Sequence, residues 1–92
     1  MNLVRCDVRE GLRKTEVVAA VTDARGRKHE IRVEGDFLIQ KDSDSYLPVG
    51  LIQFAAKEHQ VLIEFPHEPD SGINRIWVSD KQLHHSLSEA FA

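Results

Sequence analysis

The chain has a single cysteine, Cys6, among its 92 residues. One thiol cannot form an internal disulfide, and it cannot supply the several sulfur ligands of a cysteine-based zinc site. Cys6 stands two residues from both Val4 and Val8, a spacing that places all three side chains on one face of a strand. We therefore expect Cys6 to be a small core residue.

Long hydrophobic runs are also missing from the sequence. No stretch approaches the roughly 20 consecutive apolar residues that a membrane-spanning helix needs. The first residues, MNLVRCDVREGLRK, alternate charged with apolar side chains, whereas a secretory signal peptide is continuously apolar in its centre. We expect a cytoplasmic protein that does not associate with membranes.

Motifs of catalysis and of cofactor binding are absent. The glycine patterns of the phosphate loop and of dinucleotide-binding folds do not occur, and the serines and histidines show no local arrangement of nucleophile and base. A chain of this length can bury one compact core, so we expect one domain over residues 1–92. The expectation is a non-enzymatic protein without a cofactor.

The charge of the chain is small and unevenly distributed. The net charge is −3, which disfavours a general phosphate-binding surface. Residues 1–32 hold eight Lys and Arg against five Asp and Glu, whereas residues 33–92 hold four against ten. The basic side chains are thus concentrated in the N-terminal third of the sequence.

Much of the chain alternates apolar and polar residues with the period of two that is typical of half-buried strands. The pattern is clear over residues 3–9 and 60–65. Residues 17–22 and 30–33 are rich in β-forming side chains and are joined by DARGRK, in which Gly26 can adopt a positive φ. These two segments predict a β-hairpin.

Two more strands are expected in the middle of the chain. Residues 37–40 predict a short strand. Residues 46–54 predict another, which Pro48 must either interrupt or confine to the edge of the sheet, because proline has no N–H to donate to a ladder.

The C-terminal residues change to a helical period. Leu83, Leu87 and Phe91 recur every four residues, and SDKQ at residues 79–82 has the pattern of a capping box. We expect an amphipathic helix over about residues 80–91 that packs its apolar face against the sheet.

The predicted fold is mostly β, with six to seven short strands within residues 3–78 followed by one helix. The favoured form is a small antiparallel sheet that is strongly bent or closed into a barrel, because closure removes exposed strand edges. An open sheet with the helix lying across one face is the alternative.

The segment HEPDSGINRIWV, which begins at His67, has two interpretations. Its first acidic and imidazole side chains, His67, Glu68 and Asp70, are of the types that bind metals, but neighbours in an extended segment point in opposite directions. Pro69 and Gly72 are residue types that chain reversals select. We therefore favour a turn and expect no metal site.

Arg75 and Trp77 follow that turn and share one face of the next predicted strand. Either Trp77 covers the edge of the core with the Arg75 stem packed along it, or the pair is an exposed anchor for a partner. The first functional hypothesis is therefore an interaction module that binds another protein, or a second copy of itself, through this pair.

A second hypothesis rests on the predicted hairpin. Arg25, Arg27, Lys28 and Arg32 cluster near its tip, and small β-domains bind nucleic acid through such loops. The hairpin lacks the aromatic rings that single-strand binders normally pair with positive charge. Weak nucleic-acid binding is therefore the alternative, and self-association through a sheet edge is a third hypothesis.

Overall fold

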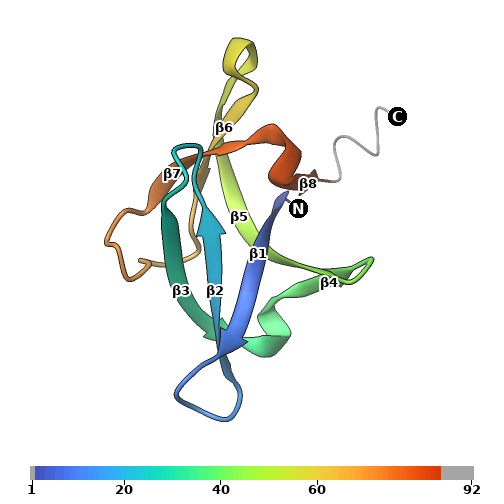
Figure 1. Cartoon of the computed structure of the whole chain (residues 1–92), viewed down its shortest axis with the longest axis vertical. Helices are drawn as coiled ribbons and strands as arrows, with labels where there is room; N and C mark the ends of the chain where they lie inside the picture. The colour runs from blue at the N-terminus through green and yellow to red at the C-terminus, as the bar shows by residue number, and fades with distance from the viewer. Residues whose placement is uncertain (1, 86–92) are drawn as a thin grey trace.

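The computed structural model describes residues 2–85, which form one strongly curled antiparallel sheet of eight strands, a half-barrel (Figure 1). The strand order is β3-β2-β1-β5-β6-β7, with β4 paired to β5 and β8 paired to β1. The strands are β1 (Asn2–Glu10), β2 (Glu16–Thr22), β3 (Lys28–Glu34), β4 (Ile39–Lys41), β5 (Asp44–Ala55), β6 (Gln60–Glu64), β7 (Arg75–Ser79) and β8 (Leu83–His85). Three 3-10 turns are η1 (Gly35–Phe37), η2 (Ala56–Glu58) and η3 (Asp80–Gln82).

Strand β1 is the central element of this sheet. Its residues 2–6 pair with β5 on one edge, while on the other edge residues 2–4 pair with β8 and residues 7–10 pair with β2. A single strand that serves three neighbours bends the sheet around it, because each ladder adds its own right-handed twist. The mostly β, strongly bent antiparallel fold predicted from the sequence is confirmed.

The core lies on the concave side of the curled sheet and follows the predicted alternation along β6, whereas on β1 Leu3 is also buried and Val8, which the sequence places on the face of Cys6, is 42% exposed. Cys6 is 7% exposed, and burial, followed by the charge of Asp7, raises the pKa of its thiol to about 11. The largest completely buried side chains are Val4, Val21, Ile31, Leu47, Val61, Ile63 and Val78.

The predicted β2–β3 hairpin is confirmed. Its register runs from Glu16 opposite Glu34 to Thr22 opposite Lys28, and Gly26 adopts φ +84° in the connecting turn. An L-residue with a Cβ rarely adopts this conformation, so the turn requires glycine at this position.

Pro48 lies within a strand that has partners on both edges. On the edge opposite β1, the ladder to β4 ends at Tyr46 and the ladder to β6 begins at Gly50. Pro48 therefore stands where β5 changes partner on that edge. The strand is neither interrupted nor at the edge of the sheet, but the position of Pro48 needs no N–H donor on that edge because no ladder is formed there.

The prediction of a C-terminal helix is wrong for the residues that the structure describes. The capping box itself forms, with the Lys81 N–H donating to Ser79 Oγ at 3.3 Å and the Ser79 N–H donating to Gln82 Oε1 at 2.9 Å. It caps a single 3-10 turn, after which Leu83 is extended (φ −92°, ψ 143°). The rest of the predicted helix, residues 86–91, lies outside the described residues.

The physical reason for this difference is the open second edge of β1. Residues 2–4 need partners for their backbone N–H and C=O groups on the side away from β5, and β8 supplies them. Leu83 packs against the core from this strand. Strand β8 is also the eighth strand, where six to seven were predicted.

No helix in residues 2–85 is long and apolar enough to span a membrane.

Replacement of Ile63 by alanine tests the location of the core. Ile63 is completely buried on β6, so Ile63→Ala should lower the free energy of unfolding by about 2–5 kcal/mol. The control is Ile52→Ala, because Ile52 is 40% exposed on β5 and its truncation should cost much less. Urea unfolding measures both, and equal losses for the two variants would contradict this core.

Candidate functional site

The segment that connects β6 to β7, residues 65–74, is named the strap here because it runs along the free edge of β3 (Figure 1). The Asp70 N–H donates to the Glu30 carbonyl at 2.7 Å, and His67 Nε2 donates to the Arg32 carbonyl at 2.8 Å. The strap therefore satisfies backbone acceptors on β3 that a neighbouring strand would otherwise bind.

The interior of the strap is the chain reversal that the sequence predicts. Gly72 adopts φ +77°, and its N–H donates to the Pro69 carbonyl at 2.9 Å. His67 is engaged with the β3 backbone and Asp70 faces the Arg32 guanidinium at 3.5 Å. Within residues 2–85 no three His, Cys, Asp or Glu side chains converge as metal ligands would.

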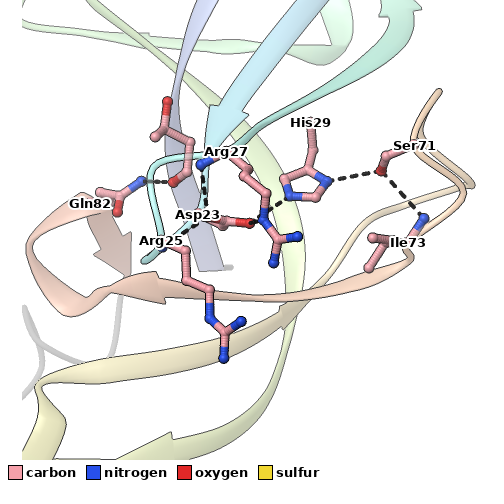
Figure 2. Close-up of polar contacts among 8 residues, drawn as sticks. Asp23, Arg25, Arg27, His29, Ser71, Ile73 and Gln82 are labelled. Carbon is pink, nitrogen blue, oxygen red and sulfur yellow. Dashed lines mark hydrogen bonds and ion pairs between the residues drawn. The ribbon is translucent and has the colours of Figure 1, made fainter.

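The strap is tied to the β2–β3 hairpin by a chain of side-chain hydrogen bonds (Figure 2). His29, only 3% exposed, lies between Asp23 and Ser71. Its Nε2 is 2.8 Å from Asp23 Oδ2, and its Nδ1 is 2.8 Å from Ser71 Oγ. Because an ionised carboxylate can only accept, Nε2 carries a proton and donates to Asp23.

Asp23 is held in its ionised form by this environment. Burial pushes the pKa of Asp23 upward, but the hydrogen bond from His29 and the backbone N–H groups of Arg27 and Arg25 outweigh it and lower the pKa. Both N–H groups donate to Asp23 Oδ1 at 2.9 Å. The carboxylate thus shapes the turn that carries the two arginines.

Ser71 completes the chain at its other end. Ser71 Oγ lies 2.8 Å from His29 Nδ1 and accepts a hydrogen bond from the Ile73 N–H at 3.3 Å. Serine, histidine and aspartate in hydrogen-bond sequence also form nucleophilic triads. Here the N–H groups of Gly72 and Ile73 that follow the serine are already bonded, so neither is available to an oxyanion.

Sequence reasoning did not find this chain of hydrogen bonds. The sequence patterns assign no role to His29 or Asp23, and Ser71 lies 42 residues from His29. No local motif signals a contact of that separation. The only signal in the sequence is that His29 occupies an inward position of β3. The side chains of its neighbours Lys28 and Glu30 point outward.

A cleft of about 410 Å³ opens between the β2–β3 turn and β7 and is named the Trp77 cleft. The Ala24 N–H donates to the Trp77 carbonyl at 2.7 Å and fixes the turn against that strand. The guanidinium-bearing residues Arg25, Arg27 and Arg75 line the cleft together with Trp77. The basic β2–β3 turn and the pair Arg75 and Trp77, which are far apart in the sequence, therefore meet at this cleft.

The other two predicted basic residues lie elsewhere. Lys28 is exposed at the start of β3, and Arg32 lies further along that strand, where it pairs with Asp70 of the strap. Neither residue lines the Trp77 cleft. The structure thus divides the predicted basic cluster into two arginines at the cleft and two cations outside it.

Trp77 lies on the outer face of the sheet. Its neighbours Ile76 and Val78 are buried in the core, so the side chain between them points the other way. It is half-buried and stands opposite Leu62 of β6. The side chain is therefore partly covered, and Trp77 is one of the residues that line the cleft.

The Trp77 cleft is rich in positive charge. Arg75 pairs with Glu64 at 2.9 Å and Arg27 lies 3.6 Å from Asp23, whereas Arg25 has no ion-pair partner among the described residues. Figure 2 shows the Arg25 side chain extending away from Asp23. Asp23 is the one acid among the described lining residues, and His29 already binds it.

No family model, curated protein or solved structure matches this chain. The chemistry of the Trp77 cleft must therefore be judged from its own residues. Guanidinium groups bind carboxylates and phosphates through paired N–H donors, and an indole face offers apolar contact. An anionic ligand with a flat or apolar portion fits this combination.

Replacement of Asp23 by asparagine tests the buried hydrogen-bond chain. A carboxyl whose folded-state pKa lies below its ordinary value of 3.8 contributes stability above that pH, and the contribution is lost as the pH falls through the folded pKa. Asp23→Asn should therefore lower the free energy of unfolding at pH 7 by about 1.5–3 kcal/mol. The difference from wild type should shrink below about pH 4.

The control for this experiment is Asp44→Asn, because Asp44 is exposed on β5 and its removal should change stability by less than about 0.5 kcal/mol. Urea unfolding at a series of pH values gives both curves. A constant difference between Asp23→Asn and wild type from pH 7 to pH 3 would contradict an ionised, hydrogen-bonded Asp23.

Proposed function

We propose that this domain is a non-catalytic interaction module that binds an acidic segment of a partner protein in the Trp77 cleft. The observation that supports the proposal is the meeting of Arg25, Arg27 and Arg75 beside Trp77, from parts of the chain about fifty residues apart. Arginine and tryptophan are also the residue types that contribute most to binding at protein interfaces.

The size and rigidity of the cleft favour a short segment over a flat surface contact. A volume of about 410 Å³ lies at the small end of ligand-binding clefts and accommodates a few side chains. The turn is fixed by Asp23 and by the Ala24 hydrogen bond, so little ordering is required on binding. Ile73, 46% exposed at the rim, offers apolar contact to a residue next to the acidic one.

Single-stranded nucleic acid is the second candidate. The hairpin lacks aromatic rings in its own sequence, but Trp77 lies beside its arginines and supplies a ring on which a base could stack. Against this, Arg32 is paired with Asp70, Lys28 lies outside the cleft, and the net charge is −3. A long phosphate backbone would therefore meet few continuous positive charges, and a protein partner is favoured.

Binding of a labelled poly-glutamate peptide at low salt tests the proposal directly. Trp77 is the only tryptophan, so its fluorescence reports occupation of the cleft. Arg25→Ala should weaken binding roughly tenfold, because it removes a guanidinium with no competing partner among the described residues. Added salt should also weaken binding.

Arg5→Ala is the matched control, because Arg5 is an exposed arginine on β1 that does not line the Trp77 cleft. Equal affinities for the Arg25→Ala and Arg5→Ala variants would contradict binding in this cleft. A labelled oligo(dT) measured in parallel decides between the two candidates. Tighter binding of the oligonucleotide, lost in Arg25→Ala, would replace the protein-binding proposal with the nucleic-acid one.

The non-catalytic part of the proposal has a separate test at Ser71. A fluorophosphonate reagent labels serines that are activated by a histidine and supported by an oxyanion hole. We expect no labelling of the wild-type chain above that of Ser71→Ala, because the neighbouring N–H groups of Gly72 and Ile73 are bonded. Covalent labelling of Ser71, detected by mass spectrometry, would show an enzyme instead.

A further inference from the structure

The turn between β1 and β2, residues 11–15, exposes a large apolar side chain. Leu12 is 88% exposed, the highest value among the large apolar residues that the structure leaves exposed. Arg13 and Lys14 follow it, are also exposed, and form no ion pair within residues 2–85. An exposed leucine that is followed by two cations without ion pairs has the composition of an anchor. The matching site would be apolar with an acidic rim.

The Leu12 turn is held in a defined shape. The Gly11 N–H donates to the Glu16 carbonyl at 3.0 Å, and the Leu12 N–H lies 3.4 Å from Glu16 Oε1. A Cβ at Gly11 would come within 2.7 Å of the Glu16 carbonyl oxygen, so only glycine permits this close approach. Leu12 is therefore presented by a rigid turn, and its exposure shows that it does not fold back onto its own chain.

A groove of about 510 Å³ with the complementary composition lies at the end of β3. It is named the Phe37 groove. Its apolar part comes from Val33, Phe37 and Pro66, with Phe37 41% exposed. Glu34 and Asp36 line its acidic side, and neither carboxylate forms an ion pair within the described part of the chain.

The Leu12 turn and the Phe37 groove lie at the same end of the molecule. The Gly35 N–H, at the start of η1, donates to the Thr15 carbonyl at 2.9 Å and joins the two segments. Figure 1 shows the blue β1–β2 turn and the green η1 turn together at the lower end of the sheet. The Trp77 cleft lies at the opposite end of β2 and β3, beside the β2–β3 turn.

We propose that the chain forms a two-fold symmetric dimer in which Leu12 of each copy occupies the Phe37 groove of the other. A two-fold interface uses the same patch on both copies, so it requires an anchor and its receptor site at one end of the molecule. The Leu12 turn and the Phe37 groove meet this requirement, and Arg13 and Lys14 match two carboxylates on the partner copy.

A second copy of the chain accounts for both the exposed Leu12 and the open Phe37 groove. An unrelated basic peptide would fill the Phe37 groove but would leave Leu12 exposed, whereas reciprocal exchange covers both apolar surfaces twice per dimer. The contact is small, so the dimer should be a weak one that dissociates on dilution. It does not involve the Trp77 cleft, so it stands independently of the proposed binding function.

Sedimentation velocity over a range of concentrations tests the dimer. The wild-type chain should shift from the monomer mass to twice that mass as its concentration rises. Leu12→Ala should weaken the association by roughly tenfold or more, because it removes most of the buried apolar anchor. Ile52→Ala is the matched control, since Ile52 is an exposed apolar residue on β5 away from the turn. Circular dichroism verifies that each variant is folded.

A charge exchange identifies the partner site. The double variant Arg13→Glu, Lys14→Glu should remain monomeric, and so should Glu34→Lys, Asp36→Lys, because each places like charges together. An equimolar mixture of the two variants should form a heterodimer, because every turn then meets a groove of opposite charge. A wild-type chain that stays monomeric up to about millimolar concentration, or a mixture that stays monomeric, would overturn the proposal.

Discussion

The buried imidazole of His29 is the contact on which the rest of this structure depends. It lies within the β2–β3 hairpin, where it bonds Asp23 of the turn, and it joins this hairpin to the strap through Ser71. A half-barrel has two free edges, and a small sheet with open edges pairs readily with other chains. By holding the strap against β3, His29 covers one of these edges with hydrogen bonds from within the same chain.

The same contact places the groups that form the Trp77 cleft. Asp23 receives the backbone N–H groups of Arg25 and Arg27, so the carboxylate that binds His29 also sets the direction of the turn. The turn then reaches β7 through the Ala24 hydrogen bond to the Trp77 carbonyl. A buried polar network of this kind is stable only when every member has a partner, and no side-chain nitrogen or oxygen buried in the described residues lacks one. The turn that carries Arg25 and Arg27 is therefore held rigidly.

Much of the fold could be predicted because its determinants are local. The alternation around Cys6 predicts an inward face of β1, and the turn chemistry of Gly26 and Gly72 predicts two reversals, because both effects act within a few residues. The helix predicted over residues 80–91 was wrong for its described part, although the capping box at Ser79 and Gln82 forms. A capping box begins an α-helix and a 3-10 turn equally well, and the choice between them was made by the unpaired edge of β1.

The sequence by itself therefore determined most of the strands up to residue 79, the inward position of Cys6, and the turns at Gly26 and Gly72. Only the tertiary structure decided that Arg25 and Arg27 lie beside Trp77, that Lys28 and Arg32 do not, and that Ser71 and Asp23 share one histidine. The physical reason is separation along the chain. Backbone conformation and periodicity act over a few residues, whereas these groupings depend on how a curled sheet brings distant segments together, which no local pattern encodes.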